Sequence, residues 1–214
     1  MVPTVDTIRN QFLVDALVNN HKNVLIVGGT GTGKTMLIQH ALSTLEQTQW
    51  MTLNINFSAR TSSMKLQEIL ENNMEHRTKE LLSPPGGRNL VTFIDDLNMP
   101  AKDEFGSQPP LELLRQWLDY GFWYERDQVN KRKITVRGMQ LIAAMGPPGG
   151  GRSAISARLK RCFNLINFTF PDDAQVKRIF GTLLQLHFAD FDDEIRQQTD
   201  AITAVCHENG YCSN

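Results

Sequence analysis

Short apolar runs alternate with amphipathic stretches along most of the chain. Several runs are continuous and rich in β-branched residues, as in buried strands, whereas the run that begins at Trp50 alternates apolar and polar residues. A further run is interrupted at Gly138 but still reads as a strand. Strands are therefore expected at residues 23–28, 50–57, 90–95, 133–146 and 163–170.

Apolar residues at helical spacing fill the segments between these strands. Helices are expected at residues 7–20, 34–45, 64–82, 109–120, 155–161, 172–188 and 192–205. In the first of them the apolar set is Ile8, Phe12, Leu13, Leu17 and Val18, so these side chains are expected to face the core.

Strands that alternate with helices predict an α/β fold whose parallel sheet is covered on both faces. The pattern after Pro171 is helical only. Two units are therefore expected: a core at residues 1–170, and the start of a small helical subdomain at 171–214. The second unit has room for about two helices, so it is expected to be incomplete.

Composition excludes several classes of function. The chain has 22 Lys and Arg against 23 Asp and Glu, so no bulk field favours nucleic acid or a membrane surface. No apolar run approaches the ~20 residues of a membrane span, and the N-terminal residues lack a secretory pattern. Three cysteines without zinc-type pairs predict reduced thiols inside a cell, and Cys206–His207 has no second pair at ligand spacing.

The stretch GGTGTGKT fits the phosphate-loop pattern G-x-x-x-x-G-K-[ST], between a predicted strand and a predicted helix. Its members are Gly28, Gly29, Thr30, Gly31, Thr32, Gly33, Lys34 and Thr35. The glycines let backbone N–H groups converge on an anion, and the following helix adds its positive end. Lys34 supplies a cation for the β- and γ-phosphates, and the Thr35 hydroxyl can ligate Mg²⁺.

A second motif follows sixty residues later, where the predicted strand 90–95 ends in Asp95 and Asp96. Carboxylates at the carboxyl end of a parallel strand face the crevice where ligands bind. Asp95 fits the acid that orients Mg²⁺, and Asp96 fits the position that polarises an attacking water. Alone, such a pair fits a strand-end turn as well as it fits a nucleotide site. Its position after the phosphate loop favours the nucleotide site.

Longer segments carry a resemblance to a known family. NHKNVLIVGGTGTGKT, INFSARTSS, FIDDLNMPAKDEFGSQPPLELLRQWLDYGFWY, AAMGPPGGGR and SARLKRCFN together resemble a AAA+ module of a dynein heavy chain. The string DDLNMP…FGSQPPLELLRQW…AMGPPGGGR is most similar to the third module of the ring in axonemal dyneins. The similarity covers residues 3–204, whereas the last residues, CHENGYCSN, differ from the continuation expected in that family.

The resemblance implies a P-loop NTPase of AAA+ type: a central parallel five-stranded sheet flanked by helices, then a small helical lid. It implies ATP or ADP with Mg²⁺, in a ring of six modules formed by one heavy chain. Partners implied in the same way are neighbouring modules, dynein complex subunits and microtubules in a ciliary axoneme. No nucleic acid and no membrane is expected.

The resemblance also implies an arginine that acts across a module boundary. In SARLKR, Arg158 matches this arginine finger best, with Arg161 as the alternative. The finger would serve the nucleotide of the preceding module. A solvated basic helix face is the other reading of these arginines.

Two departures from the family pattern bear on hydrolysis. Asp96 stands where many AAA+ ATPases carry Glu, which withdraws the carboxylate by about 1.5 Å, and misplacement near 1 Å can cost ~10²-fold in rate. Gly146 stands where a polar sensor residue is usual, so that position offers no side-chain donor. Both departures leave binding intact and weaken turnover.

Three functions remain open from the sequence. The first is a nucleotide-gated regulatory module of a microtubule motor that hydrolyses ATP slowly. The second is a free-standing AAA+ ATPase, and the third is a truncated, non-catalytic interaction fragment. The chain has no long heptad pattern, so motor function follows from the resemblance alone.

Overall fold

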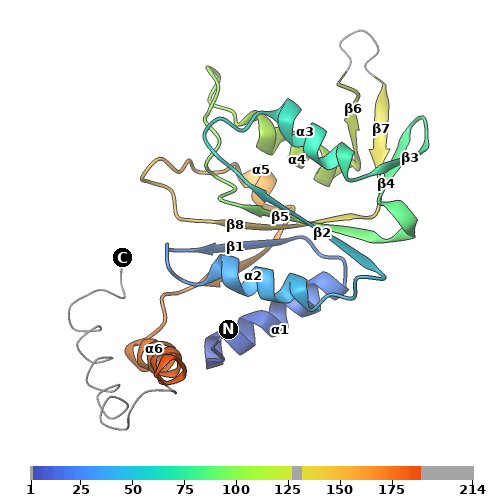
Figure 1. Ribbon diagram of the computed structural model, residues 1–214. Coiled ribbons are helices and arrows are strands. Elements are labelled where there is room, and N and C mark those ends of the chain that lie inside the picture. Colours follow the sequence, from blue (N-terminus) through green and yellow to red (C-terminus); the bar gives the residue numbers. More distant parts are fainter. Residues whose placement is uncertain (1, 127–131, 189–214) are drawn as a thin grey trace.

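A five-stranded parallel sheet forms the centre of the molecule (Figure 1). The computed structural model describes residues 2–126 and 132–188. The strand order is β2-β5-β8-β1-β9. The strands are β1 (Val24–Gly28), β2 (Trp50–Asn56), β5 (Asn89–Asp95), β8 (Met139–Met145) and β9 (Asn164–Phe168). Each of the five apolar runs therefore contributes one strand to this sheet, and the predicted parallel five-stranded sheet is confirmed.

Helices cover both faces of the sheet (Figure 1). α1 and α2 lie on one face, and α3 and α4 lie on the other. The helices are α1 (Val5–Asn19), α2 (Lys34–Ser43), α3 (Ser63–Asn72), α4 (Pro109–Tyr120), α5 (Ala157–Lys160) and α6 (Asp173–His187). Successive strand residues point to opposite faces, so Val24 and Ile26 of β1 join the core beneath α1 and α2, whereas Leu25 joins the core beneath α3 and α4.

The order of the central sheet reverses at β1. This strand pairs with β8 on one side, where Val27 faces Met145, and with β9 on the other, where Gly28 faces Phe168. Ligands of open α/β sheets bind outside the carboxyl ends of the strands at such a reversal. The phosphate loop follows β1 at this point, so the fold puts the predicted motif at the expected crevice.

A second sheet was not predicted. It has the order β3-β4-β7-β6, and its strands are β3 (Glu75–Thr78), β4 (Leu81–Ser83), β6 (Phe122–Tyr124) and β7 (Lys133–Val136). β4 leads through a 3-10 turn (Pro85–Gly87) to the start of β5, and β7 leads to the start of β8. The second sheet therefore lies at the amino ends of the central strands, away from the phosphate loop (Figure 1).

The predicted helix 64–82 was wrong in its second half, because α3 ends at Asn72 and β3 and β4 follow. Pairing with β7 holds β4 in the sheet, and Leu82 is buried in the same core as Trp123 and Ile134. These residues have apolar positions at helical spacing but form strands, because long-range pairing and burial outweigh local helix propensity.

The predicted buried face of α1 was only partly right. Val18 is buried and Leu17 packs against the core as expected, whereas Ile8 and Phe12 are 59% and 71% exposed and Asn10 and Val14 are buried instead. Apolar residues surround this helix rather than forming one stripe, so spacing alone did not select the packed side. Contact with α2 and the sheet selected the Val14 and Val18 side.

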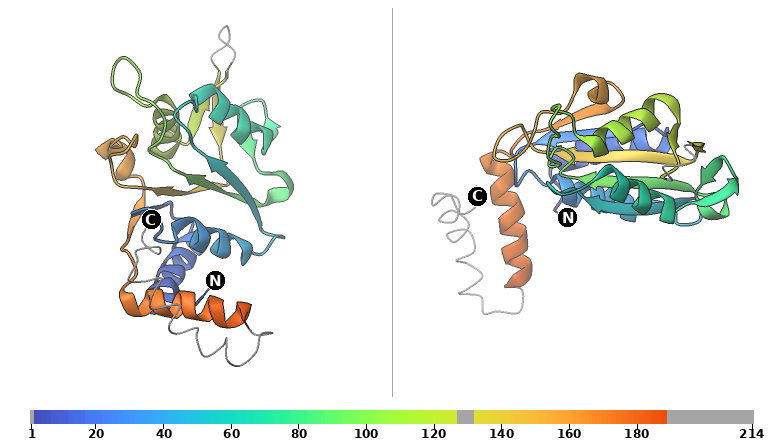
Figure 2. Two further views of the ribbon diagram at one scale, coloured as in Figure 1. Left: turned by 60° about the vertical axis from the view of Figure 1, so that its left-hand side comes forward. Right: turned by 90° about the horizontal axis from the view of Figure 1, so that it is seen from above.

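α6 lies beside α1, away from the central sheet (Figure 2). Gln175 of α6 donates a hydrogen bond to Asp6 of α1 at 2.7 Å, and Val176 is buried. In the segments 2–126 and 132–188, no helix is long and apolar enough to cross a bilayer. The predicted helix 192–205 and the Cys206–His207 pair lie outside the described residues.

Candidate functional site

The phosphate loop turns tightly between β1 and α2. A side chain at Gly28 would place its Cβ 2.6 Å from the carbonyl oxygen of Phe168, so only glycine fits against β9 at that point. Gly33 caps α2 with a φ of 79°, which favours glycine. The N-terminus of α2 consequently faces the crevice, where helix N–H groups and the helix dipole attract anions.

Lys34 folds back over the loop. Its Nζ donates to the carbonyl of Gly29 at 2.6 Å, and the Thr32 hydroxyl donates to the same carbonyl at 2.9 Å. Burial lowers the pKa of Lys34; among its charged neighbours, Asp95 opposes the shift and Arg152 adds to it. The ammonium lies among both positive and negative charges, as expected for a group that contacts a polyanion.

Thr35 and Asp95 meet although sixty residues separate them. The Thr35 hydroxyl donates to Asp95 Oδ2 at 2.6 Å, and Asp95 Oδ1 accepts the Asp96 backbone N–H at 2.9 Å. No group of three or more His, Cys, Asp or Glu side chains with metal-ligand geometry occurs among the residues described. The hydroxyl and carboxylate suit Mg²⁺, which keeps several waters and takes few protein ligands.

Asp96 adopts an uncommon backbone conformation, with a φ of 51°. Asp is one of the few non-glycine residues enriched in this region. Its carboxylate pairs with Arg152, whose Nη2 lies 3.3 Å from Asp96 Oδ1. Arg152 comes from the glycine-rich loop after β8, and sequence reasoning missed it. The signal was available, because a residue just beyond the carboxyl end of β8 reaches the same edge of the sheet as Asp95.

These groups line one cleft of about 280 Å³. It contains Lys34, Thr35, Asp95, Asp96 and Arg152, together with the loop positions Thr30, Gly31 and Gly33 and the backbone of Gly146. The structure thus brings together the two predicted motifs and Gly146, the position that lacks a side-chain donor, and it adds Arg152 to them.

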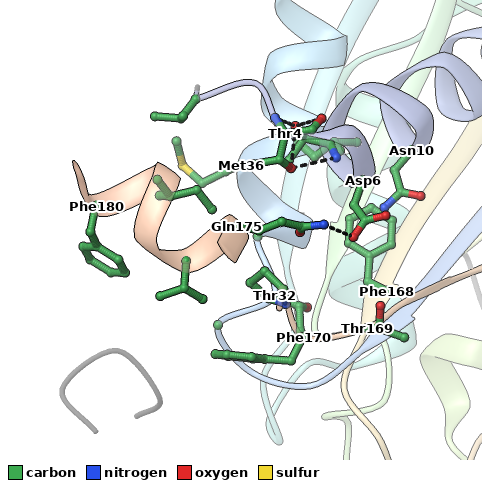
Figure 3. A pocket seen from close by; sticks show the side chains of 18 residues that line it. Thr4, Asp6, Asn10, Thr32, Met36, Phe168, Thr169, Phe170, Gln175 and Phe180 are labelled. Carbon is green, nitrogen blue, oxygen red and sulfur yellow. Dashed lines mark hydrogen bonds between the residues drawn. The ribbon is translucent and has the colours of Figure 1, made fainter. Parts of the chain in front are cut away.

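An adjoining pocket of about 250 Å³ shares Gly31, Gly33 and Met36 with this cleft (Figure 3). It lies between α1, the phosphate loop and α6, and its lining is mostly apolar, including Phe168 and Phe170. The hydrogen bond between Gln175 and Asp6 crosses from α6 to α1 in this pocket (Figure 3). A polar cleft beside an apolar pocket has room for a charged group and a flat apolar group of one ligand.

The two candidate finger arginines lie in different surroundings. Arg161 donates to Asp119 Oδ1 at 2.9 Å, and Asp119 also pairs with Arg115 of its own helix at 3.0 Å. The Arg158 side chain, by contrast, is exposed on α5 and makes no hydrogen bond or ion pair with any residue that the structure describes. Arg161 is therefore held within the chain, and Arg158 is available to an outside partner. Neither arginine lines the cleft.

Comparisons with known proteins agree with this geometry. The family model of the P-loop containing dynein motor region matches residues 1–171. The chain is 53% identical over 203 residues to dynein axonemal heavy chain 2 of Mus musculus, and 52% identical over 203 residues to the Dynein-1-beta heavy chain, flagellar inner arm I1 complex, of Chlamydomonas reinhardtii. Both alignments cover 95% of this chain but only 4% of the relative.

A further relative is dynein axonemal heavy chain 1 of Mus musculus, with 45% identity over 185 residues. That alignment covers 86% of this chain and 4% of the relative. The chain thus spans about one twenty-fifth of the length of these heavy chains.

Proposed function

Because this chain belongs to the dynein heavy-chain family, as a AAA+ module of the P-loop motor region, we propose that it is a regulatory nucleotide site. In this proposal the module binds ATP or ADP with Mg²⁺, hydrolyses ATP slowly, and reports its nucleotide state to neighbouring modules. The observation that carries the proposal is the 2.6 Å hydrogen bond between Thr35 and Asp95, which joins the phosphate loop to the second nucleotide motif.

Each predicted site residue has a role in this proposal. The backbone of Gly28, Gly29, Thr30, Gly31, Thr32 and Gly33 cradles the phosphates. Lys34 neutralises the β- and γ-phosphates, Thr35 ligates Mg²⁺, and Asp95 orders the waters of that ion. The adjoining apolar pocket would take the base and ribose, between α1 and α6 (Figure 3). Residues 171–214 would then begin the lid over a core at 1–170.

Hydrolysis is slow in this proposal because three of its requirements are weakly met. Water attacks the γ-phosphorus and the bond to the β–γ bridging oxygen breaks, which yields ADP and phosphate. Asp96, which would accept the water's proton, is one methylene shorter than Glu and is paired with Arg152 at 3.3 Å. Gly146 supplies no side chain, and the stabilising arginine must come from another module; such fingers are worth roughly 10³ or more in rate.

The wider assembly is proposed from the relatives. Their names place them in axonemes and in a flagellar inner arm complex. We accordingly propose that the module works in a ciliary axoneme, within a heavy chain that moves on microtubules and joins other dynein subunits. Arg158 would reach the nucleotide of the preceding module in that ring, because its side chain is exposed while Arg161 is held by Asp119.

The test combines binding, turnover and assembly on the whole chain. Calorimetric titration with ATP and ADP, each with and without Mg²⁺, should show binding that Mg²⁺ strengthens. Steady-state phosphate release should stay far below the enzyme median of ~10 s⁻¹, and size exclusion with ATP should show a monomer. No binding heat would refute the nucleotide site. Turnover near that median, or ATP-dependent rings, would instead support a free-standing ATPase.

A further inference from the structure

The loop that follows β8 folds back and places Arg152 at the cleft. Gly149 and Arg152 exchange two backbone hydrogen bonds of 3.0 Å, which closes a tight turn. Asn98 is fully buried and bonds to both ends of the loop. Its side-chain Nδ2 donates to the carbonyl of Gly146 at 2.9 Å, and its backbone carbonyl accepts the Ser153 N–H at 3.0 Å. The position of Arg152 is therefore set by the fold rather than by a free surface loop.

The Arg152 side chain occupies the space that a side chain at position 146 would take. A Cβ built on Gly146 would lie 3.0 Å from both Cδ and Nε of Arg152. Gly146 does not have a positive φ, so its backbone would accept other residues. The two positions thus compete for one volume, and here glycine leaves that volume to the arginine.

The guanidinium keeps unused hydrogen-bonding capacity inside the cleft. Arg152 is 28% exposed, and its Nη2 pairs with Asp96 at 3.3 Å. Its Nε is buried and has no hydrogen-bond partner among the residues described. A guanidinium carries five N–H donors in a planar fork that matches phosphate oxygens. Nε lies against Gly146 and is closed to a ligand, but the partly exposed Nη end of the same fork can donate to an acceptor that enters the cleft.

Charge in the cleft favours the same ligand. Lys34 and Arg152 line it together, and Arg152 contributes to the lowered pKa of Lys34. Two cations repel each other, and a polyphosphate that lies between them compensates this repulsion. Asp95 and Asp96 act against this repulsion at Lys34, yet with burial and Arg152 the pKa of Lys34 is still lowered.

We propose that Arg152 binds the terminal phosphate of a nucleoside triphosphate in this chain's own site, in place of the side chain that position 146 lacks. The proposal rests on the nucleotide site proposed above. Arg152 is then the residue that distinguishes a triphosphate from a diphosphate. Asp96 holds its guanidinium beside the cleft, and this pairing also draws the Asp96 carboxylate away from an attacking water.

The test measures the ratio of affinities for a non-hydrolysable ATP analogue and for ADP, each with Mg²⁺, in the whole chain. In Arg152→Ala we expect affinity for the analogue to fall about tenfold or more, because one charge-assisted contact is lost. Affinity for ADP should stay within about twofold. Arg132→Ala is the matched control, since it removes an arginine that pairs with Glu125 at 3.0 Å away from the cleft.

Two further variants keep the test decisive. Arg152→Lys retains the charge but not the planar fork, so it should keep part of the preference for the ATP analogue over ADP. It also replaces the alanine variant in the test if that variant does not fold. Gly146→Asn in the Arg152→Ala background should restore part of the lost preference, because the new amide enters the vacated volume. Equal loss for both nucleotides, or no loss, would refute the role of Arg152 while the nucleotide site stands. A parent chain that binds neither nucleotide would refute the nucleotide site itself.

Discussion

The two walls of the cleft are built in different ways. The phosphate-loop wall comes from eight consecutive residues, and its contacts are short: Lys34 to Gly29 and Thr35 to Asp95 are both 2.6 Å. The opposite wall combines Asp96, Gly146 and Arg152 from two separate loops, and its ion pair is longer at 3.3 Å. In the proposed function the first wall would hold phosphate and metal, and the second would face the reacting end of a nucleotide.

This difference separates binding from chemistry. The phosphate-loop wall, called the binding wall below, depends on backbone geometry that the glycines allow and on one hydrogen bond to β5, between Thr35 and Asp95. The other wall, called the chemical wall below, combines Asp96, which is shorter than the usual Glu, and Gly146, which lacks a side chain, with Arg152, which occupies the space at position 146. A module can keep the first wall intact while the second is altered, which is what a site that senses nucleotide requires.

The largest effect is expected on the binding wall. Lys34→Ala removes the ammonium that we propose neutralises the β- and γ-phosphates, so affinity for ATP should fall roughly 10²-fold. Calorimetric titration of both proteins measures this, with Lys22→Ala as a control outside the cleft. If affinity is unchanged, the phosphates do not lie on residues 28–35.

A smaller effect should come from the strand end of the same wall. Asp95→Ala removes the partner of Thr35, so the gain in affinity that Mg²⁺ provides should shrink about tenfold. Titrations with and without Mg²⁺ measure that gain. Asp103→Ala is the control, because its carboxylate bonds only within its own exposed loop. Full Mg²⁺ dependence in the Asp95 variant would remove Asp95 from the metal site.

On the chemical wall the expected gain is modest. Asp96→Glu lengthens the acid and should raise a slow phosphate-release rate roughly fivefold, since the stabilising arginine of another module is still missing. Asp96→Asn is the matched control and should lower the rate. The φ of 51° at this position favours Asp over Glu, so a thermal melt should accompany the assay. A faster rate in the Asn variant would exclude Asp96 as the base.

Beyond the cleft, Asp119→Ala should lower the free energy of unfolding by about 0.5–1 kcal/mol, because it breaks the pair with the exposed Arg161 and the pair with Arg115, whose side chain is 22% exposed. Burial raises the pKa of Asp119, but the bonds from Arg161, Cys162 and Arg115 outweigh burial and hold that pKa below its usual value. The carboxylate therefore stabilises the fold above its ordinary pKa, and this contribution is lost as the pH falls through the lowered pKa. Urea titrations of both proteins measure it, and nucleotide affinity should not change.

The smallest effect is expected for Arg158→Ala in this chain alone. Its exposed side chain does not line the cleft, so nucleotide affinity should stay within about twofold. In a longer polypeptide that includes the preceding module, the same change should slow hydrolysis there, and Lys160→Ala should not. A loss of nucleotide affinity in the single module would place Arg158 at its own site and contradict a role across the boundary.

Periodicity was reliable where one segment decides its own structure and failed where a distant segment decides. Each of the five apolar runs supplied one strand of the central sheet. Continuous apolar residues mark the central strands β1, β5 and β8, which are buried on both faces, whereas the edge strand β2 comes from the alternating run. Residues 75–83 also carried helical spacing, yet β4 pairs with β7, which lies about fifty residues away. α1 was predicted correctly as a helix, but its packed side only in part, because the neighbouring elements rather than the spacing select it.

The sequence by itself determined the phosphate loop and the order of the two nucleotide motifs. Eight adjacent residues specify that loop through glycine backbone freedom and short-range bonds, so the motif can be recognised without its distant contacts to β9 and Asp95. Only the tertiary structure decided what each arginine does. Arg161 is held by Asp119, Arg158 is left exposed, and Arg152 turns into the cleft beside Asp96. The places of Arg161 and Arg152 each depend on a carboxylate dozens of residues away, which comes within reach only when the strands adopt their order in the sheet.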